Sequence, residues 1–215
     1  MVGTVLLMIH IAAGSVALPT AVIALITAKG GTHHIRAGRV YAIAMTVIFI
    51  TALPLAILGS NVFLSLIALF SFYLVFAGWR FARNRHGHAQ PVDWAAVAVM
   101  GLTGVGMWGY GAVLLLSGSA QWITMAVFGS IAVALSAADA RFHTGRRASG
   151  KQRIARHLTN MLAGTIATVT AVLVVNVETD PVWLAWILPT IVITPLIVWW
   201  NVRIGRETKR RETPG

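Results

Sequence analysis

Histidine is the residue of this sequence with the widest scope for chemistry, because seven histidines are present and cysteine is absent. An imidazole nitrogen can bind zinc or haem iron, and the ring can carry a proton near neutral pH. The absence of cysteine excludes disulfides, thiolate metal sites and iron–sulfur clusters. The histidines therefore define three hypotheses: a binding or transport site linked to a proton, a b-type haem site and a zinc site.

His10 is the only histidine well inside an apolar stretch, which runs from Val2 to Ala28. At ~1.5 Å per residue it would lie roughly 9–12 Å inside a membrane, where ionisable groups are costly and tend to mark sites or pathways. The same depth count predicts a ligand-binding layer in the outer half of the membrane: His10, Thr51, Tyr110, Thr170 and Trp186. We expect His10 to line a cavity with Tyr110 and Trp186. A hydrogen bond to a neighbouring hydroxyl would satisfy the ring equally well.

A second set of candidate metal ligands lies near the ends of apolar stretches: His34, Asp139, His143 and His157. Asp139 and His143 are four residues apart and would share one face of a helix. Asp139 is more typical of an anchor that pairs with a basic residue, for which the candidates are Arg39, Arg156 and His157. His34 lies about six residues before the next apolar stretch, so neither haem nor zinc is the favoured cofactor.

The elements that carry these residues are seven apolar stretches, each long enough to cross a hydrocarbon core of ~30 Å as a helix. They are Val2 to Ala28, Val40 to Leu58, Val62 to Phe81, Ala95 to Leu116, Ile123 to Ala140, Leu158 to Val177 and Val182 to Val202. Hydrophobic residues make up 57% of the chain and the mean hydropathy is +0.78, which is typical of a multi-pass membrane protein. The sequence predicts an all-α fold, with a seven-helix transmembrane bundle in residues 1–203 and a basic tail in residues 204–215.

The positive charges predict how the bundle is oriented. All 17 Lys and Arg residues fall in alternate loops and in the tail, on one side of the predicted bundle. By the positive-inside rule this side is cytoplasmic, which places the N-terminus outside and the C-terminus inside. The net charge of +11 then indicates attraction to anionic lipid headgroups and not to nucleic acid. We expect an integral protein of a bacterial inner membrane, and a homo-oligomer is compatible with the sequence.

The fourth apolar stretch contains several glycines. Gly104, Gly106 and Gly109 match G-x-G-x-x-G, but dinucleotide binding needs a strand before the glycines and none is predicted. Small residues in a membrane helix predict close packing against a neighbouring helix. Retinal is excluded as a cofactor, because no lysine falls inside an apolar stretch to form a Schiff base.

Five stretches carry a recognisable family pattern: LMIHIAAG, HIRAGRVY, NVFLSLIALFSFYL, RHLTNMLAGTIATVTAVLVVN and VWLAWILPT. The residues that fit H-R-x-x-G-R-x-Y are His34, Gly38, Arg39 and Tyr41. His157 and Met161 fit a second pattern, H-x-x-x-M. By these stretches the chain resembles the domain of unknown function 2306 group of bacterial membrane proteins. The resemblance implies an integral membrane protein and no known activity.

Three functions follow from these residues, in order of preference. The first is binding or transport of a small molecule, linked to a proton, through the outer-half layer around His10. The second is membrane electron transfer by a b-type haem. The third is hydrolysis by a zinc-dependent membrane enzyme with its site at the cytoplasmic rim.

Overall fold

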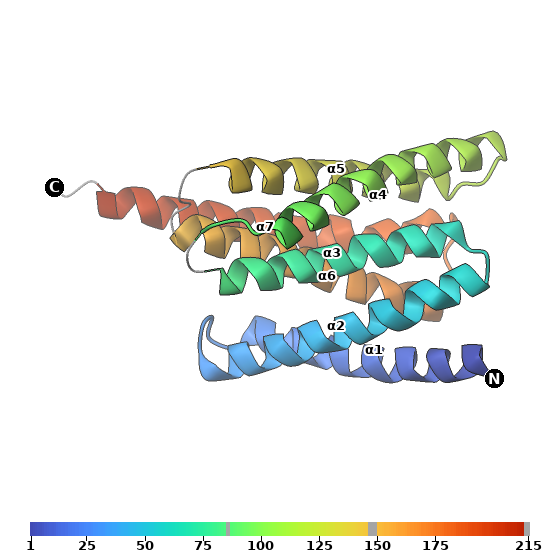
Figure 1. Ribbon diagram of the computed structural model, residues 1–215, viewed down its shortest axis with the longest axis horizontal. Coiled ribbons are helices and arrows are strands. Elements are labelled where there is room, and N and C mark those ends of the chain that lie inside the picture. The colour runs from blue at the N-terminus through green and yellow to red at the C-terminus, as the bar shows by residue number, and fades with distance from the viewer. Residues whose placement is uncertain (85–86, 146–149, 213–215) are drawn as a thin grey trace.

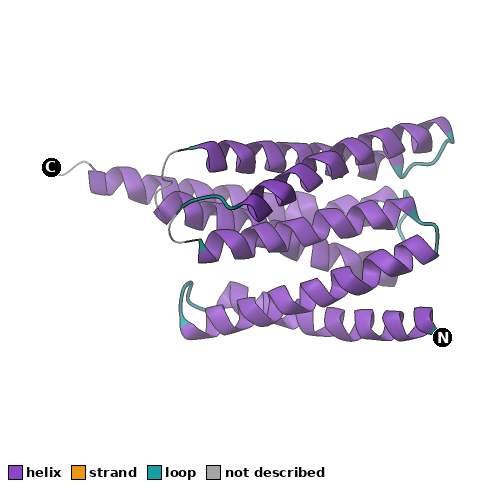
Figure 2. Ribbon diagram, viewed as in Figure 1, coloured by secondary structure: helices purple, strands orange, loops and turns teal. Residues whose placement is uncertain are grey.

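The computed structural model describes residues 1–84, 87–145 and 150–212, without the side chains from residue 203 onward. The basic residues and the histidine outside this description are Arg85, His86, Arg146 and Arg147. Every regular element in the described chain is a helix (Figure 2). The helices are α1 (Val2–Ile26), α2 (Thr32–Leu58), α3 (Val62–Arg83), α4 (Pro91–Leu116), α5 (Trp122–Thr144), α6 (Gly150–Asn176) and α7 (Trp183–Glu212). Each is long and apolar enough to cross a membrane, which confirms the predicted seven-helix, multi-pass architecture.

The helices are arranged in three layers (Figure 1). The pair α1 and α2 lies on one side, and the pair α4 and α5 lies on the opposite side. Between them α3 packs against α6, and α6 packs against α7. The central layer therefore separates two peripheral helical hairpins, each of which meets different neighbours.

Small residues allow the central helices to approach closely. A Cβ atom at Gly164 of α6 would lie 2.7 Å from Val75 Cγ2 of α3, and one at Gly78 of α3 would lie 2.8 Å from Met161 Cγ of α6. No side chain larger than hydrogen fits at either position without movement of its neighbour. The contact between α3 and α6 thus depends on glycine, as is common between membrane helices.

The glycines of α4 were predicted to mediate close packing, and the structure confirms this for Gly104. A Cβ atom there would lie 2.9 Å from the carbonyl oxygen of Gly129 in α5. Gly109, by contrast, has open space around the position of a Cβ atom. The match to G-x-G-x-x-G therefore combines one packing glycine of α4 with another that makes no such contact.

Three helices begin four or more residues earlier than hydropathy predicted. The starts are Thr32 in place of Val40 for α2, Pro91 in place of Ala95 for α4, and Gly150 in place of Leu158 for α6. Polar residues can continue a helix into the membrane interface, where their side chains reach water. Such helical segments have low hydropathy, so a search for apolar stretches does not include them. His34 thus lies inside α2, at the entry of the helix, although it precedes the apolar stretch. At the other end of the chain α7 continues to Glu212, so the predicted tail extends the last helix.

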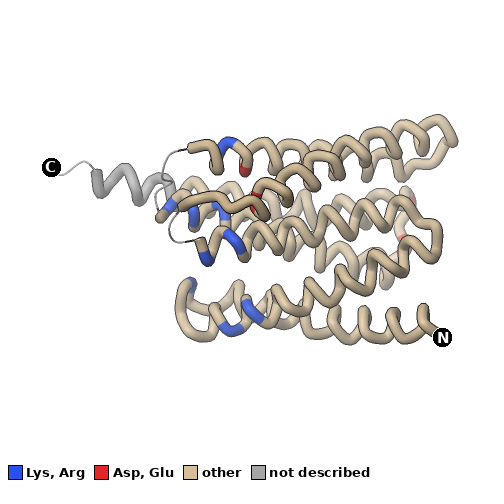
Figure 3. Tube along the Cα trace, viewed as in Figure 1, with Lys and Arg blue, Asp and Glu red and all other residues tan. Residues whose placement is uncertain are grey.

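The described Lys and Arg residues gather at one end of the bundle, the end from which α7 leaves (Figure 3). Glu178 and Asp180 lie in the connection between α6 and α7 at the other end. Two carboxylates, those of Asp93 and Asp139, lie at the basic end, where α4 begins and α5 approaches its last turn. We call this region the basic end, and it contains the sites described next.

Candidate functional site

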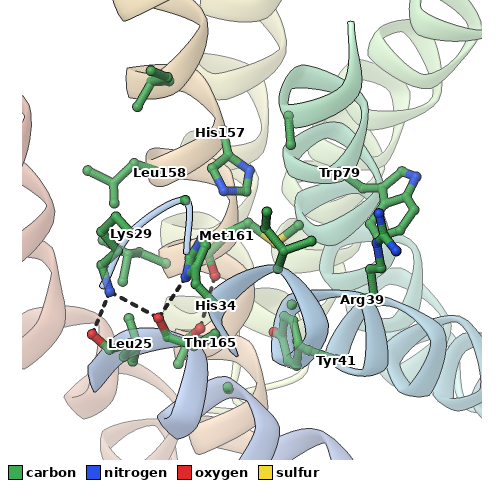
Figure 4. A pocket seen from close by; sticks show the side chains of 18 of the residues that line it. Leu25, Lys29, His34, Arg39, Tyr41, Trp79, His157, Leu158, Met161 and Thr165 are labelled. Atoms are coloured by element: carbon green, nitrogen blue, oxygen red, sulfur yellow. Dashed lines mark hydrogen bonds between the residues drawn. The ribbon is translucent and has the colours of Figure 1, made fainter. Parts of the chain in front are cut away.

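A cavity of about 890 Å³ opens at the basic end between α1, α2, α3 and α6 (Figure 4), and Trp200 of α7 also lines it. This volume falls within the range of small-molecule and cofactor sites. Most of the lining is apolar, and Leu25, Leu158, Met161 and Leu162 contribute to it. The cavity is therefore suited to a ligand with a substantial apolar body.

Four cationic side chains line the same cavity: Lys29, Arg39, Arg83 and Arg153. Among the described residues, the lining contains no Asp or Glu. None of the four cations forms an ion pair with a described carboxylate. The cavity thus combines an apolar lining with positive charge that no described acidic side chain neutralises.

Backbone carbonyl groups hold two of these cations in place. Arg153 Nη1 donates to the carbonyl oxygens of Phe81 (2.9 Å) and Ala82 (2.6 Å) near the C-terminus of α3. Lys29 Nζ donates to the carbonyl oxygens of Ala24 (3.0 Å) and Leu25 near the C-terminus of α1. Cations at helix C-termini are stabilised by the helix dipole while they keep their charge. Partial burial lowers the pKa of Lys29 below its ordinary value.

His34 of α2 and His157 of α6 meet in this cavity. Their ring centroids are 6.3 Å apart and the ring planes are perpendicular (Figure 4). His34 Nδ1 donates to the carbonyl oxygen of Ala24 (2.9 Å), and His157 Nδ1 donates to that of Gly78 (2.8 Å). A carbonyl oxygen can only accept, so Nδ1 carries a proton in both rings. In each ring, Nε2 is the nitrogen that forms no hydrogen bond to a described residue.

Asp139 lies on the opposite side of α3 and is fully buried. Its Oδ1 is 3.5 Å from Arg156 Nη1, and its Oδ2 accepts hydrogen bonds from Tyr73 Oη (2.8 Å) and Asn160 Nδ2 (3.4 Å). The prediction that Asp139 pairs with a basic residue is confirmed, with Arg156 as the partner. An isolated buried carboxylate would be costly, and partners from α3 and α6 stabilise this one.

Sequence reasoning missed a second ion pair at the basic end, between Arg80 and Asp93. Arg80 Nε and Nη2 donate to the two carboxylate oxygens of Asp93 at 2.6 and 2.9 Å. Asp93 Oδ2 also accepts from the backbone N–H of Gln90 (2.8 Å), which completes a capping box at the start of α4. The sequence did contain a pattern that indicates the cap, because Pro91 after Gln90 and an acidic residue three positions after Gln90 mark a helix start.

The four candidate metal ligands fall into two places. His34 and His157 lie in the cavity, whereas Asp139 and His143 lie near the C-terminus of α5. The His143 ring stacks on that of Phe81, with centroids 5.4 Å apart. Within the described residues, no group of three His, Asp or Glu side chains lies close enough to hold a metal ion. A zinc site built from all four candidates does not form.

The predicted outer-half layer is divided between different parts of the bundle. His10 Nδ1 lies 3.1 Å from Thr51 Oγ1, and Thr51 in turn donates to the carbonyl oxygen of Val47 (2.8 Å). The histidine is therefore satisfied by a contact between α1 and α2. His10 does not line the cavity at the basic end, the small space beside Arg80 and Asp93, or the groove formed by residues 190–202 of α7.

The other members of that layer do not join His10. Tyr110 of α4 and Trp186 of α7 pack against the hydrophobic cluster of α3, α4 and α5, whereas His10 contacts α2. Thr170 is buried in α6, and its Oγ1 has no hydrogen-bond partner among the described residues. Depth placed His10 beside Thr51 correctly, but the structure does not bring His10, Tyr110 and Trp186 to one cavity.

No family model, no curated protein and no solved structure matches this chain.

Proposed function

We propose that this integral membrane protein binds an amphipathic anionic small molecule in the cavity at the basic end. The observation that carries the proposal is the set of four cations, Lys29, Arg39, Arg83 and Arg153, beside an apolar lining that contains no described carboxylate. An anionic group would lie among the cations and an apolar body would fill the space between α1, α2 and α6. Binding thus remains the preferred function, and its site moves from the layer around His10 to this cavity.

The charge distribution supports an orientation for the site. The basic end faces the cytoplasm if the positive-inside rule applies, with the N-terminus outside. The basic residues then also attract anionic lipid headgroups of a bacterial inner membrane. Membership of the domain of unknown function 2306 group belongs to the same proposal: His34, Arg39, Tyr41, His157 and Met161, which carry the resemblance, all line the cavity.

Quenching of tryptophan fluorescence by a brominated fatty acid tests the proposal. Trp79 and Trp200 line the cavity, and bromine quenches tryptophan on contact. The protein in phosphatidylcholine nanodiscs is titrated with 9,10-dibromostearate and with its uncharged methyl ester. We expect saturable quenching by the acid only, and loss of the saturable part when both tryptophans are replaced by Phe.

Two matched double variants separate the cavity from general surface charge. Arg39→Gln with Arg83→Gln removes two charges from the lining, and we expect about tenfold weaker binding of the acid. Arg36→Gln with Arg141→Gln removes two exposed charges that do not line the cavity, and we expect no change. Equal binding by both double variants would contradict the proposal. Brominated phosphatidylglycerol in the nanodisc, tested without fatty acid, shows whether a bilayer lipid or a free amphiphile is the better ligand.

A further inference from the structure

We propose that the cavity ligand is a metalloporphyrin of the haem type, with His34 and His157 as its two axial ligands. The inference rests on the proposed function, because a porphyrin with two propionates is one amphipathic anion among many. What selects it is the pair of imidazoles inside the cavity.

Both rings are prepared for metal binding through the same nitrogen. The Nδ1–H groups donate to backbone carbonyl oxygens, of Ala24 for His34 and of Gly78 for His157. This hydrogen bond fixes the ring orientation and the tautomer, and it leaves the lone pair of Nε2 for a metal. The two carbonyl groups belong to α1 and α3, so three separate interhelical contacts define the pair.

The separation of the rings fits one metal ion between them. With metal–nitrogen bonds of about 2.0 Å and about 1.1 Å from a nitrogen to its ring centre, two imidazoles on opposite sides of a metal have centroids about 6.2 Å apart. The observed separation is 6.3 Å. Perpendicular ring planes are compatible with this arrangement, because each axial imidazole can rotate about its own metal–nitrogen bond.

The number of ligands distinguishes a metalloporphyrin from a bare metal ion. A zinc ion takes four ligands, usually three or four of them from the protein, whereas the described residues offer no third His, Asp or Glu at the pair. A porphyrin supplies four nitrogen ligands itself and needs only the two axial positions from the protein. Two histidines are therefore sufficient for haem and insufficient for zinc.

The remainder of the cavity suits the porphyrin itself. The ring is a broad apolar plane, and the cavity of about 890 Å³ has a mainly apolar lining that includes Leu25, Met161 and Trp79. Haem carries two carboxylates at one edge, and cations line the cavity without any described carboxylate among them. Arginine pairs especially well with carboxylates, since its planar fork can donate two hydrogen bonds.

Titration with haemin tests the inference. Haemin is added to the full-length protein in phosphatidylcholine nanodiscs, and absorption spectra are recorded before and after reduction with dithionite. We expect binding of one haemin per chain and the spectrum of a low-spin, six-coordinate haem with two nitrogen ligands. His34→Ala and His157→Ala should each lose this spectrum and weaken haemin binding by at least about tenfold. His33→Ala removes the exposed neighbouring histidine, which does not line the cavity, and should retain the spectrum.

A rescue experiment covers variants that fold poorly. His157→Gly opens space for a free imidazole, and addition of imidazole should restore the low-spin spectrum if His157 is an axial ligand. Haemin that binds with a high-spin spectrum, or with a spectrum unaffected by either histidine variant, would overturn the inference. Stoichiometric Zn²⁺ binding that depends on both histidines, in the absence of haemin, would also overturn it in favour of a bare metal site.

Metal-free protoporphyrin IX separates the inference from the proposed function. It has the same propionates and apolar ring as haemin, so its binding should weaken in the Arg39→Gln, Arg83→Gln double variant and should not depend on the histidines. If protoporphyrin or dibromostearate binds but haemin is not ligated by the histidines, the porphyrin inference fails and the proposed function stands. If none of the three binds in the cavity, both fail.

Discussion

The two sides of α3 at the basic end use the same residue types in opposite ways. Towards α4 and α5, Arg80 pairs with Asp93 and Arg156 pairs with Asp139, and the space beside the first pair is only about 10 Å³. Towards α1 and α2, the cavity of about 890 Å³ has cations in its lining and no described carboxylate. The first side is neutralised and densely packed, and the second is charged and open.

The two sides differ in how their cations are held. Buried carboxylates need counterions, so the arginines near Asp93 and Asp139 form ion pairs with these carboxylates and are not available to a ligand. Lys29 and Arg153 are held by carbonyl groups at helix ends, which orient a cation without neutralising it. We therefore expect changes on the first side to affect stability and changes on the second side to affect binding.

The largest effect is expected for Asp139→Ala. It removes a fully buried carboxylate and leaves Arg156 and Tyr73 without their partner, which should lower the free energy of unfolding by about 3 kcal/mol. The measurement is the midpoint of unfolding in SDS, together with the yield of monodisperse protein. Glu178→Ala removes an exposed carboxylate at the other end and should change neither. A strong loss of ligand affinity in the Asp139→Ala protein that does fold would contradict the expectation that this side of α3 affects stability and not binding.

Asp93→Ala should have the second-largest effect. The variant loses both the ion pair with Arg80 and the cap of α4 at Gln90, which should lower the free energy of unfolding by about 2 kcal/mol. The partial exposure of Arg80 to solvent limits this loss. Asp93→Asn keeps an acceptor for the cap and should recover roughly half of the loss. Both are compared by SDS unfolding. Equal stability of the two variants would mean that the cap contributes nothing beyond the charge.

Gly38→Leu tests the open side by filling it. A Cβ atom at Gly38 meets no atom within 4 Å, and the residue lines the cavity, so a leucine side chain would occupy ligand space. We expect about tenfold weaker binding of dibromostearate or haemin, equal to ~1.4 kcal/mol, without a lower SDS midpoint. The matched control is Gly109→Leu, at a helical glycine with equally open space outside the cavity. Similar losses of binding in both variants would show that the cavity is not the site.

The smallest effect is the pH dependence that Lys29 contributes. Partial burial lowers the pKa of its ammonium group below the ordinary 10.5. The charged form attracts an anionic ligand, so the Lys29 contribution is complete below the lowered pKa and is lost as pH rises through it. Affinity for dibromostearate should decline about two- to threefold over this alkaline range. Lys29→Met should abolish the decline, and a decline that persists unchanged in Lys29→Met would assign it to another group.

Sequence alone predicted the features that depend on position along the chain. Hydropathy located all seven spans, and the spacing of Lys and Arg placed them on one side of the bundle, because both depend on depth in the membrane. The pairing of Asp139 followed from the cost of an isolated carboxylate among basic residues. The contact of His10 with Thr51 also agrees with their common depth, and Asp93 could have been found from the capping pattern at Gln90.

Tertiary structure decided which side chains meet at a given depth. His34 and His157 are far apart in sequence, and their meeting depends on the early start of α2 and on the close approach of α3 and α6 at Gly78 and Gly164. Tyr110 has a suitable depth but lies on the other side of the bundle from His10. Hydropathy reports position along the membrane normal, whereas the lateral order and rotation of the helices are set by packing between residues distant in the chain. That packing gathers the two histidines and the four cations that have no described carboxylate partner into one cavity.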